Sequence, residues 1–199
     1  KRSAAHFSFF DKADCTRLMQ MKDKWQIQAE KENIRLTYMP FFIRALSITL
    51  KKYPQANASK DTNTNTLLLH QHQHVGIAVK TDLGLIVAVL RDVQNKTLET
   101  LIREYDALIG RAKKNKLTRE EMMHSTITIS NFGPLGGLWA TPVINYPEVA
   151  ILGVAKIRRE AVVKDDSIVI RPLVNLSWSF DHCVIDGHLA AAISNEFIA

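Results

Sequence analysis

The stretch that decides the fold of this chain is Phe180-Asp181-His182-Cys183-Val184-Ile185-Asp186-Gly187. It follows residues 173–180, where apolar and polar side chains alternate as in a β-strand, with Leu176, Trp178 and Phe180 pointing one way and Asn175, Ser177 and Ser179 the other. A histidine at a strand end can act as a general base near neutral pH, because its unperturbed pKa is about 6.5. We expect Asp186 to hold the turn and the imidazole, and Gly187 to permit a tight backbone before a helix. A histidine satisfied within an Asp-Gly turn would give the same pattern, so this stretch alone leaves both interpretations open.

Length and composition are typical of a soluble globular protein. The chain has 199 residues, of which 46% are hydrophobic and 23% charged. This length suits one large domain or two small ones, and no linker or internal repeat divides it, so we expect one α/β domain over residues 1–199. The chain opens at Lys1 and stops within the last predicted helix, and we expect it to be incomplete at both ends. No apolar run reaches membrane-spanning length.

The charge pattern says little about partners. The net charge is +6, and one basic cluster contains Arg111, Lys113, Lys114 and Lys116. Interleaved aromatic residues and nucleic-acid motifs are missing, so a solvated helix end is the favoured interpretation and no nucleic-acid partner is predicted. A phosphate-bearing cofactor would account for some of the charge. Cys15 and Cys183 are far apart in the sequence, which fits a reducing compartment better than a disulfide framework.

Hydrophobic periodicity and capping residues predict mixed helices and strands. Helices are expected from an Asp14 cap through Ile27, from a Thr37 cap to a point before Pro54, over Thr97–Lys114, after a Thr118/Glu121 capping box, and from Leu189 onward. Strands are expected at His6–Asp11, two or three times between Leu67 and Val89, at Thr126–Ser130, at Val149–Ile157, in a Val162–Ile170 hairpin turning at Asp165-Asp166, and before His182. The stretch 57–65 is predicted to be a polar turn and 131–141 a glycine-rich loop. This mixture favours an α/β domain with a mixed sheet.

Two further groups have side chains suited to chemistry. Ser130 ends a predicted strand just before the glycine-rich loop, where a hydroxyl can donate a hydrogen bond to a developing oxyanion, although such a serine can equally be structural. His70, His72 and His74 would share one face of a strand, a spacing that could bind zinc or nickel. No carboxylate or cysteine stands near them in the sequence, so a histidine-lined exposed strand is favoured and no metal site is predicted.

Together these stretches resemble the catalytic domain of the dihydrolipoamide acyltransferases, the core components of the 2-oxo acid dehydrogenase complexes. The similarity covers nearly the whole chain, in order, through residues 5–11, 36–42, 57–59, 75–79, 84–87, 126–137, 142–145, 147–153 and 177–187. The most specific segments are Thr128-Ile129-Ser130-Asn131-Phe132-Gly133 and Pro147-Glu148-Val149-Ala150-Ile151-Leu152-Gly153. The His-x-x-x-Asp-Gly motif is shared with chloramphenicol acetyltransferase.

The resemblance implies a chloramphenicol-acetyltransferase-like fold with two layers and a mixed sheet. It implies transfer of an acyl group between coenzyme A and dihydrolipoamide, the latter carried on a lipoyl domain outside this chain. His182 would be the general base, Ser130 the oxyanion donor and Asp186 the residue that holds His182. Coenzyme A would contact Ser130, Asn131, Thr37 and Lys22.

The resemblance also implies a homotrimer in which His182 comes from one subunit and Ser130 from its neighbour. Trimers would build a cubic 24-mer or a dodecahedral 60-mer. Lipoyl and peripheral-subunit-binding domains, absent from this chain, would connect it to the decarboxylase and dihydrolipoamide dehydrogenase components. No membrane partner is expected, and the location would be the cytoplasm of a bacterium or the mitochondrial matrix of a eukaryote. Branched-chain and pyruvate-type acyl groups both stay open.

Three positions depart from the family pattern. Cys183 stands where arginine is usual, Lys80 where aspartate is usual near the cofactor, and Ala88 where proline is usual. The changes at 183 and 80 leave a second hypothesis open, a non-catalytic core scaffold, although His182 and Ser130 are retained. A third hypothesis, an antibiotic acetyltransferase that uses the same histidine on a hydroxyl acceptor, is disfavoured by the lipoamide-specific segments.

Overall fold

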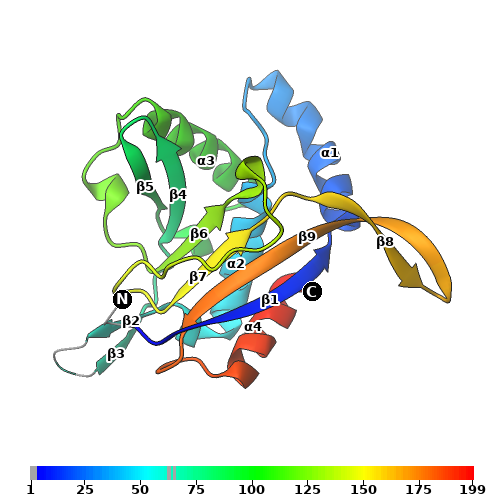
Figure 1. The fold of residues 1–199 in the computed structure, drawn as a ribbon. Coiled ribbons are helices and arrows are strands. Elements are labelled where there is room, and N and C mark those ends of the chain that lie inside the picture. Colours follow the sequence, from blue (N-terminus) through cyan, green and yellow to red (C-terminus); the bar gives the residue numbers. More distant parts are fainter. Residues whose placement is uncertain (1–3, 62–63, 65) are drawn as a thin grey trace.

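A seven-stranded mixed β-sheet forms the centre of the molecule (Figure 1). The computed structural model describes residues 4–61, 64 and 66–199. The sheet has the order β1-β9-β7-β6-β4-β5, with β8 also paired to β9; β6 is parallel to β4 and β7, and the other neighbours are antiparallel. Its strands are β1 (His6–Asp14), β4 (Val75–Thr81), β5 (Gly84–Leu90), β6 (Ile127–Asn131), β7 (Ala150–Val154), β8 (Arg158–Lys164) and β9 (Ser167–Asp181). The predicted α/β fold with a mixed sheet is confirmed.

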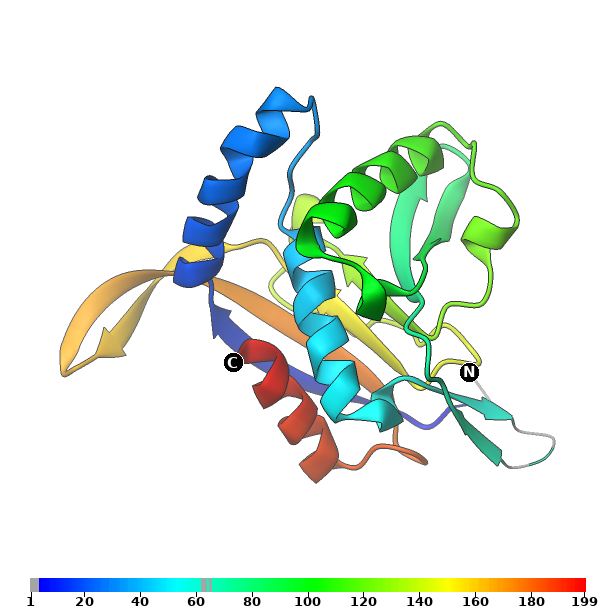
Figure 2. The same cartoon turned by 180° about the vertical axis from the view of Figure 1, so that it is seen from behind.

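Helices α2, α3 and α4 cover one face of this sheet, as the view from behind shows (Figure 2). The α-helices of the described residues are α1 (Thr16–Lys31), α2 (Met39–Lys52), α3 (Leu98–Lys113) and α4 (Gly187–Ile198), and short 3-10 turns lie at Pro54–Ala56, Val93–Asn95, Glu120–Met122 and Gly133–Leu135. Each covering helix turns an apolar stripe to the sheet, so that Ile43, Leu46, Leu101 and Ile193 are fully buried. The result is a two-layer domain with one main core.

Strand β9 is buried on both faces near its C-terminal end. On the helix side, Trp178 is fully buried, stacks on Phe180 with ring centroids 5.4 Å apart, and meets the edge of Phe197 at 5.6 Å. On the other side, the Ser177 hydroxyl accepts a hydrogen bond from Ala140 N (3.2 Å), and the neighbouring Asn175 Nδ2 donates to Leu138 O (2.9 Å). The polar side of the predicted alternation is therefore covered by the glycine-rich loop and not by solvent.

A buried carboxylate joins β6 to the segment that follows the glycine-rich loop. Glu148 is only 2% exposed and accepts hydrogen bonds from Thr128 Oγ1 (2.7 Å), from Asn145 Nδ2 (2.9 Å) and from the Ser125 hydroxyl. Burial raises the pKa of Glu148 above its ordinary value, although these three hydrogen bonds act in the opposite direction. Glu148 is thus the centre of a buried polar network.

Several sequence-based details are confirmed at the level of single hydrogen bonds. Thr97 caps α3 by accepting from Thr100 N at 3.1 Å. Thr118 and Glu121 form the predicted reciprocal capping box, at 3.0 and 3.2 Å, around a 3-10 turn. The hairpin between β8 and β9 turns at Asp165 and Asp166, both in the left-handed region with φ of 49° and 57°.

Two predicted helix caps are wrong by one residue. Strand β1 continues to Asp14, and Cys15 is the cap of α1, while Asp14 Oδ1 accepts from Thr16 N at 2.8 Å. Tyr38 is the cap of α2, and Thr37 Oγ1 accepts from Met39 N at 3.3 Å. In both cases the expected side chain bonds to the first helical residue and lies one position before the cap.

The segment predicted as a polar turn contains a strand instead. β2 (Ala58–Asp61) pairs with β3 (Thr66–Leu69) as a separate two-stranded hairpin, and positions 62, 63 and 65 lie outside the described residues. β2 is held further by a bridge between Ser59 and Glu148. Such long-range pairing cannot be inferred from the polar composition of the segment.

The three alternating histidines are not in a strand, because β3 ends at Leu69 and β4 begins at Val75. His70 Nε2 lies 2.7 Å from Ser59 Oγ, His72 Nδ1 lies 2.7 Å from Asp92 Oδ1, and His74 Nδ1 accepts from Asp92 N at 3.1 Å. These contacts fix each ring to a local partner. Within the described residues no group of three or more His, Cys, Asp or Glu side chains could hold a metal ion.

The first prediction concerns the centre of the core. We expect Trp178→Ala to lower the free energy of unfolding by about 3–5 kcal/mol, because it removes a fully buried indole and leaves a cavity. Leu83→Ala is the matched control: Leu83 is 81% exposed, and its loss should change stability by less than about 0.5 kcal/mol. Urea denaturation followed by circular dichroism measures both, and equal effects would contradict the described core.

The second prediction concerns the buried carboxylate. The folded-state pKa of Glu148 is raised above 4.5, so its contribution to stability is fully present below pH 4.5 and is lost as pH rises through the raised value. We therefore expect Glu148→Gln, which does not ionise, to gain stability relative to the unmodified chain as pH rises from about 4 to 8. Denaturant midpoints measured across this range test it, and a difference independent of pH would contradict it.

Candidate functional site

Ser130 lies near the end of β6, on the sheet face opposite the helices. Its register partners are Ala78 on β4 and Gly153 on β7. The preceding Ile129 is fully buried in the core, so strand alternation directs Ser130 to the other face. Gly153 is closely surrounded, because a Cβ there would lie 3.1 Å from both the Phe132 ring and Ser177 O. The half-buried Ser130 hydroxyl therefore stands between two small residues on an otherwise crowded sheet.

His182 occupies the turn that follows β9. Its backbone N–H donates to Ala5 O at 2.8 Å, and its ring lies 4.5 Å from the ring of Phe7, centroid to centroid. The preceding Asp181 is 1% exposed and accepts from Ala5 N (3.1 Å) and Cys183 N (3.0 Å). The exposed His182 side chain thus projects from a tightly bonded backbone.

Asp186 caps the helix that follows this turn. Its Oδ1 accepts from Leu189 N at 2.8 Å and fixes the start of α4. Among the described hydrogen bonds there is none between Asp186 and the His182 ring. The carboxylate therefore orders the segment after His182, and its expected hold on the imidazole stays a prediction.

Ser130 and His182 lie at opposite ends of the sheet. In the register of the sheet, Ser130 pairs with Gly153, and Gly153 pairs with Ser177. His182 follows Ser177 by five residues. This register separates them by about 17 Å along the strands and about 10 Å across two strand spacings. One substrate atom cannot contact both side chains of a single chain, because hydrogen bonding requires about 3 Å.

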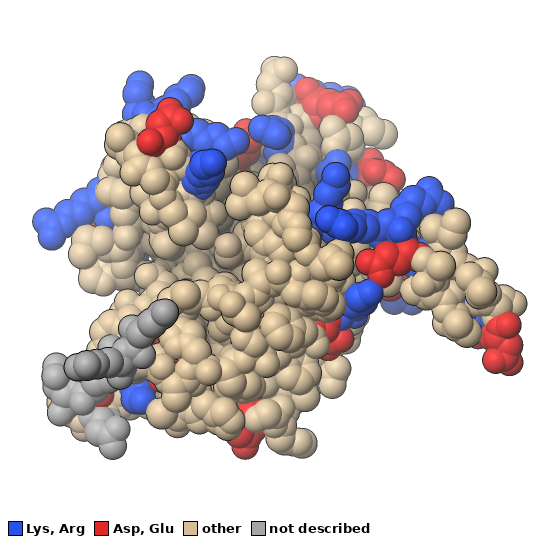
Figure 3. Space-filling model, viewed as in Figure 1, with Lys and Arg blue, Asp and Glu red and all other residues tan. Residues whose placement is uncertain are grey.

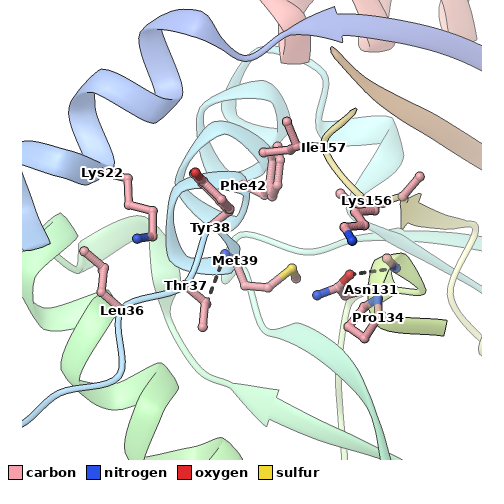
Figure 4. Close-up of a pocket in the computed structure, with 13 residues that line it drawn as sticks. Lys22, Leu36, Thr37, Tyr38, Met39, Phe42, Asn131, Pro134, Lys156 and Ile157 are labelled. Atoms are coloured by element: carbon pink, nitrogen blue, oxygen red, sulfur yellow. Dashed lines mark hydrogen bonds between the residues drawn. The ribbon is translucent and has the colours of Figure 1, made fainter. Parts of the chain in front are cut away.

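A pocket of about 440 Å³ lies where α1, the start of α2 and the ends of β6 and β7 meet (Figure 4). It contains three of the predicted cofactor residues, Lys22, Thr37 and Asn131, but not Ser130. The other lining residues are Leu36, Tyr38, Met39, Phe42, Gly133, Pro134, Val154, Ala155, Lys156 and Ile157. Its size is within the range of small-molecule sites.

Two cations face each other across this pocket, Lys22 on α1 and Lys156 after β7 (Figure 4). Lys22 Nζ donates to Gln26 Oε1 at 2.9 Å and lies 5.4 Å from the centre of the Tyr38 ring. Burial raises the pKa of the Tyr38 phenol, so that group stays protonated at neutral pH. Figure 3 shows further Lys and Arg side chains gathered where α1 meets the start of β8. Strand β8 begins with Arg158 and Arg159, which are both exposed. The pocket is therefore suited to an anionic ligand with an apolar part.

Lys156 is a pocket residue that the sequence-based interpretation missed. Position 156 lay inside the predicted strand Val149–Ile157, and only the structure shows that β6 and β7 are parallel neighbours whose carboxyl ends meet at one edge of the sheet. Asn131 is the last residue of β6 at this edge, and Lys156 follows β7 at the same edge.

The two residues that depart from the family pattern, Lys80 and Cys183, are both exposed. Lys80 is on β4, two residues beyond the partner of Ser130, and Cys183 is a free thiol beside His182. None of the described helices has the length and apolar character needed to cross a membrane.

Comparison with known proteins finds relatives with a similar sequence. A curated relative from Bacillus subtilis, the dihydrolipoyllysine-residue acetyltransferase component of the pyruvate dehydrogenase complex, is 40% identical over 196 residues, which cover 98% of this chain and 44% of the relative. The chain thus spans less than half the length of that protein.

Solved structures agree in fold. The dihydrolipoamide acetyltransferase of Azotobacter vinelandii, studied for the role of a serine, a histidine and an asparagine in its catalytic mechanism, superimposes with a TM-score of 0.94 at 35% identity, over 98% of this chain and 81% of that one. The cubic core of the pyruvate dehydrogenase multienzyme complex gives the same TM-score, identity and coverage. Chloramphenicol acetyltransferase shares the fold, with a TM-score of 0.63 at 13% identity over 98% of this chain and 88% of that one.

The sequence model of one family matches residues 1–199, from the first residue to the last. The predicted resemblance is confirmed, and the chain belongs to the 2-oxoacid dehydrogenases acyltransferase (catalytic domain) family.

Proposed function

We propose that this chain transfers an acetyl group between dihydrolipoamide and coenzyme A, as the core domain of a pyruvate dehydrogenase complex. One observation carries the proposal. In the Azotobacter vinelandii enzyme a histidine follows the catalytic-mechanism serine by 52 residues, and an asparagine follows that histidine by four. Ser130, His182 and Asp186 have the same separations, with aspartate in place of asparagine.

The pocket supports coenzyme A as a substrate. Lys22 and Lys156 would pair with its phosphates, the Asn131 amide would donate or accept hydrogen bonds, and Met39 and Phe42 would contact its apolar parts. Asn131 adjoins Ser130 at the end of β6, so the pocket and the Ser130 hydroxyl lie at the same edge of the sheet, on opposite faces. Coenzyme A supplies the thiol that accepts the acyl group.

His182 would act as the general base. The imidazole removes the proton from the coenzyme A thiol, because an alkyl thiol is largely protonated at neutral pH and reacts as the thiolate. The new thioester bond forms at the acyl carbonyl carbon, the bond from that carbon to the dihydrolipoamide sulfur breaks, and protonated His182 returns the proton to the departing sulfur. Atoms and charge balance without an oxidant or a metal ion.

Ser130 would stabilise the negative charge that develops on the carbonyl oxygen. Its hydroxyl donates a hydrogen bond to that oxygen, and removing one such donor in other acyl-transfer enzymes costs about 2.7–4 kcal/mol of transition-state stabilisation. The small neighbours Ala78 and Gly153 leave space for the acyl group above the sheet. Lys80 is on the same face of β4 as Ala78 and adds positive charge near this position.

The separation of His182 from Ser130 supports a site shared between two copies. A trimer in which His182 of one subunit meets Ser130 of the next would satisfy the distance that one chain cannot. The hairpin of β8 and β9 projects from the body (Figure 1) and exposes Val163, Ile168 and Ile170 by 63–79%, which suits a subunit contact. The similarity to a cubic core supports the cubic 24-mer over the dodecahedral 60-mer.

The wider partners follow from the same proposal. A lipoyl domain would present the lipoamide, and the decarboxylase and dihydrolipoamide dehydrogenase would bind through domains outside this chain. The location would be the cytoplasm in a bacterium or the mitochondrial matrix in a eukaryote. The alternatives are transfer of a branched-chain acyl group and a non-catalytic scaffold. Cys183 and Lys80, which depart from the family pattern, are the residues that favour the scaffold.

The catalytic assignment gives the third prediction. In assembled protein that contains the full chain, His182→Ala should lower kcat for acetyl transfer from acetyl-coenzyme A to dihydrolipoamide by about 10²–10⁴, and Ser130→Ala by about 10²–10³. His188→Ala, an exposed histidine on α4, is the matched control and should leave kcat unchanged. Isobutyryl- and isovaleryl-coenzyme A identify the preferred acyl group. No turnover by the unmodified trimer with any donor would favour the scaffold.

Mixing the two inactive variants tests the shared site directly. If subunits are dissociated and reassembled together, a random quarter of the interfaces pairs an intact histidine with an intact serine, so activity should return to about one quarter of the unmodified level. Activity that stays at the level of the separate variants would show that each chain is a complete site.

The fourth prediction concerns the pocket. Lys22→Met and Lys156→Met should each raise the KM for coenzyme A about tenfold with little change in kcat, because each removes one charge-assisted contact. Lys24→Met is the matched control, since Lys24 is exposed on α1 and does not line the pocket. Steady-state kinetics at fixed salt concentration make the comparison. An unchanged KM in both pocket variants would exclude this pocket as the coenzyme A site.

A further inference from the structure

The turn that carries His182 is organised by one buried carboxylate. Asp181 Oδ1 accepts from the backbone N–H groups of Ala5 (3.1 Å) and Cys183 (3.0 Å), and Ala5 O in turn accepts from His182 N (2.8 Å). These three hydrogen bonds hold the backbone on both sides of His182 against Ala5. If the carboxylate moves, the imidazole moves with it.

Lys60 supplies a cation for this buried carboxylate. Lys60 Nζ lies 3.6 Å from Asp181 Oδ2, and the two side chains are 19% and 2% exposed. Among the described residues no other Lys, Arg or His side chain forms an ion pair with Asp181. An isolated ionised carboxylate in such a place would be strongly destabilised.

The charges of both groups are favoured by their surroundings. Burial acts to raise the pKa of Asp181, but the N–H groups of Cys183 and Ala5, the Cys183 side chain and the Lys60 ammonium together hold it below its ordinary value. The Cys183 side chain, and then the Asp181 carboxylate, raise the pKa of Lys60 against the effect of burial. At neutral pH the pair is therefore ionised on both sides.

Lys60 is positioned independently of the turn that it stabilises. It belongs to β2, and its backbone N–H donates to Pro147 O at 3.0 Å, while the neighbouring Ser59 forms a bridge with Glu148. The ammonium thus reaches Asp181 from a separately anchored element. The adjacent Cys183 side chain, which points to the same pair, is not a cation.

We propose that Lys60 is a positioning residue for His182: its ammonium holds the Asp181 carboxylate, which fixes the turn that presents the imidazole. This inference rests on the proposed function, because it requires His182 to be the general base. Lys60 would not touch the substrate. Its loss should therefore impair the chemical step and leave coenzyme A binding intact, since the pocket formed by Lys22, Thr37 and Lys156 does not include it.

The test compares four variants of the full, assembled protein. Lys60→Met and Lys60→Gln should lower kcat for acetyl transfer about 10- to 100-fold, because small displacements of a catalytic group cost up to about that factor, with less than a twofold change in the KM for coenzyme A. Lys60→Arg should restore most of the rate. So should the double variant Lys60→Met with Cys183→Arg, which places a cation beside Asp181 from the turn itself.

Lys52→Met is the matched control. Lys52 also pairs with a carboxylate, Glu196 at 2.6 Å, but this pair is on the exposed ends of α2 and α4, and its loss should leave kcat unchanged. Unmodified kcat in Lys60→Met would overturn the proposal, as would failure of both cation-restoring variants. Loss of folded assembly in both Lys60→Met and Lys60→Gln would make Lys60 a folding residue and would also overturn it. His182→Ala distinguishes failure of the proposed function from failure of the proposed role of Lys60. Full activity of His182→Ala would reject the proposed function. An inactive His182→Ala together with a fully active Lys60→Met would reject only the role of Lys60.

Discussion

From Leu173 to Asp181, strand β9 is buried on both faces and paired at its edges, and its neighbours in the sheet are aligned by it. Its edges pair with β1, β7 and β8, its apolar face packs Trp178 against α4, and its polar face binds the backbone of the glycine-rich loop. The apolar side chains supply the hydrophobic stabilisation, and the serine and asparagine side chains satisfy backbone groups that the loop would otherwise bury unpaired. A strand held in this way has one register. That register also fixes the position of the C-terminal end of the strand, which His182 follows.

The same register separates the chemical groups. Because Ser130 is near the end of β6 and β9 runs antiparallel to the neighbouring β7, the hydroxyl and the imidazole leave the sheet at opposite ends. The pocket is at the Ser130 end, next to the carboxyl ends of two parallel strands. Under the proposed function, one chain therefore carries two half-sites, one with the pocket and the hydroxyl and one with the base. In the proposed reaction, assembly is then a condition of catalysis and not only a way to concentrate enzymes.

Much of this could be predicted from local sequence. The spacing of Leu101, Leu108 and their neighbours predicted α3, Thr97 and the Thr118/Glu121 pair predicted two N-termini, and Asp165-Asp166 predicted the hairpin turn. The strand Ala58–Asp61 was missed because its pairing to β3 and Glu148 is not encoded in its own polar residues. The histidine strand was wrong because the segment between β3 and β4 is irregular, with the His70 ring against Ser59 and the rings of His72 and His74 against Asp92. Lys156, Asp181 and Lys60 were not identified as site residues, since only the arrangement of β2, β7 and β9 in space brings them to the pocket and to the turn.

The ion pair between Lys60 and Asp181 also has a consequence for how this protein can change over generations. Its two members lie in different thirds of the chain, so a substitution at either one alters which residues are acceptable at the other. With Lys60 as the cation, position 183 does not have to carry a charge, and here it holds a cysteine whose side chain contacts the same pair. In a collection of related sequences, such a transfer of the cation from one segment to another would appear as linked variation at positions 60 and 183 around an unchanging aspartate.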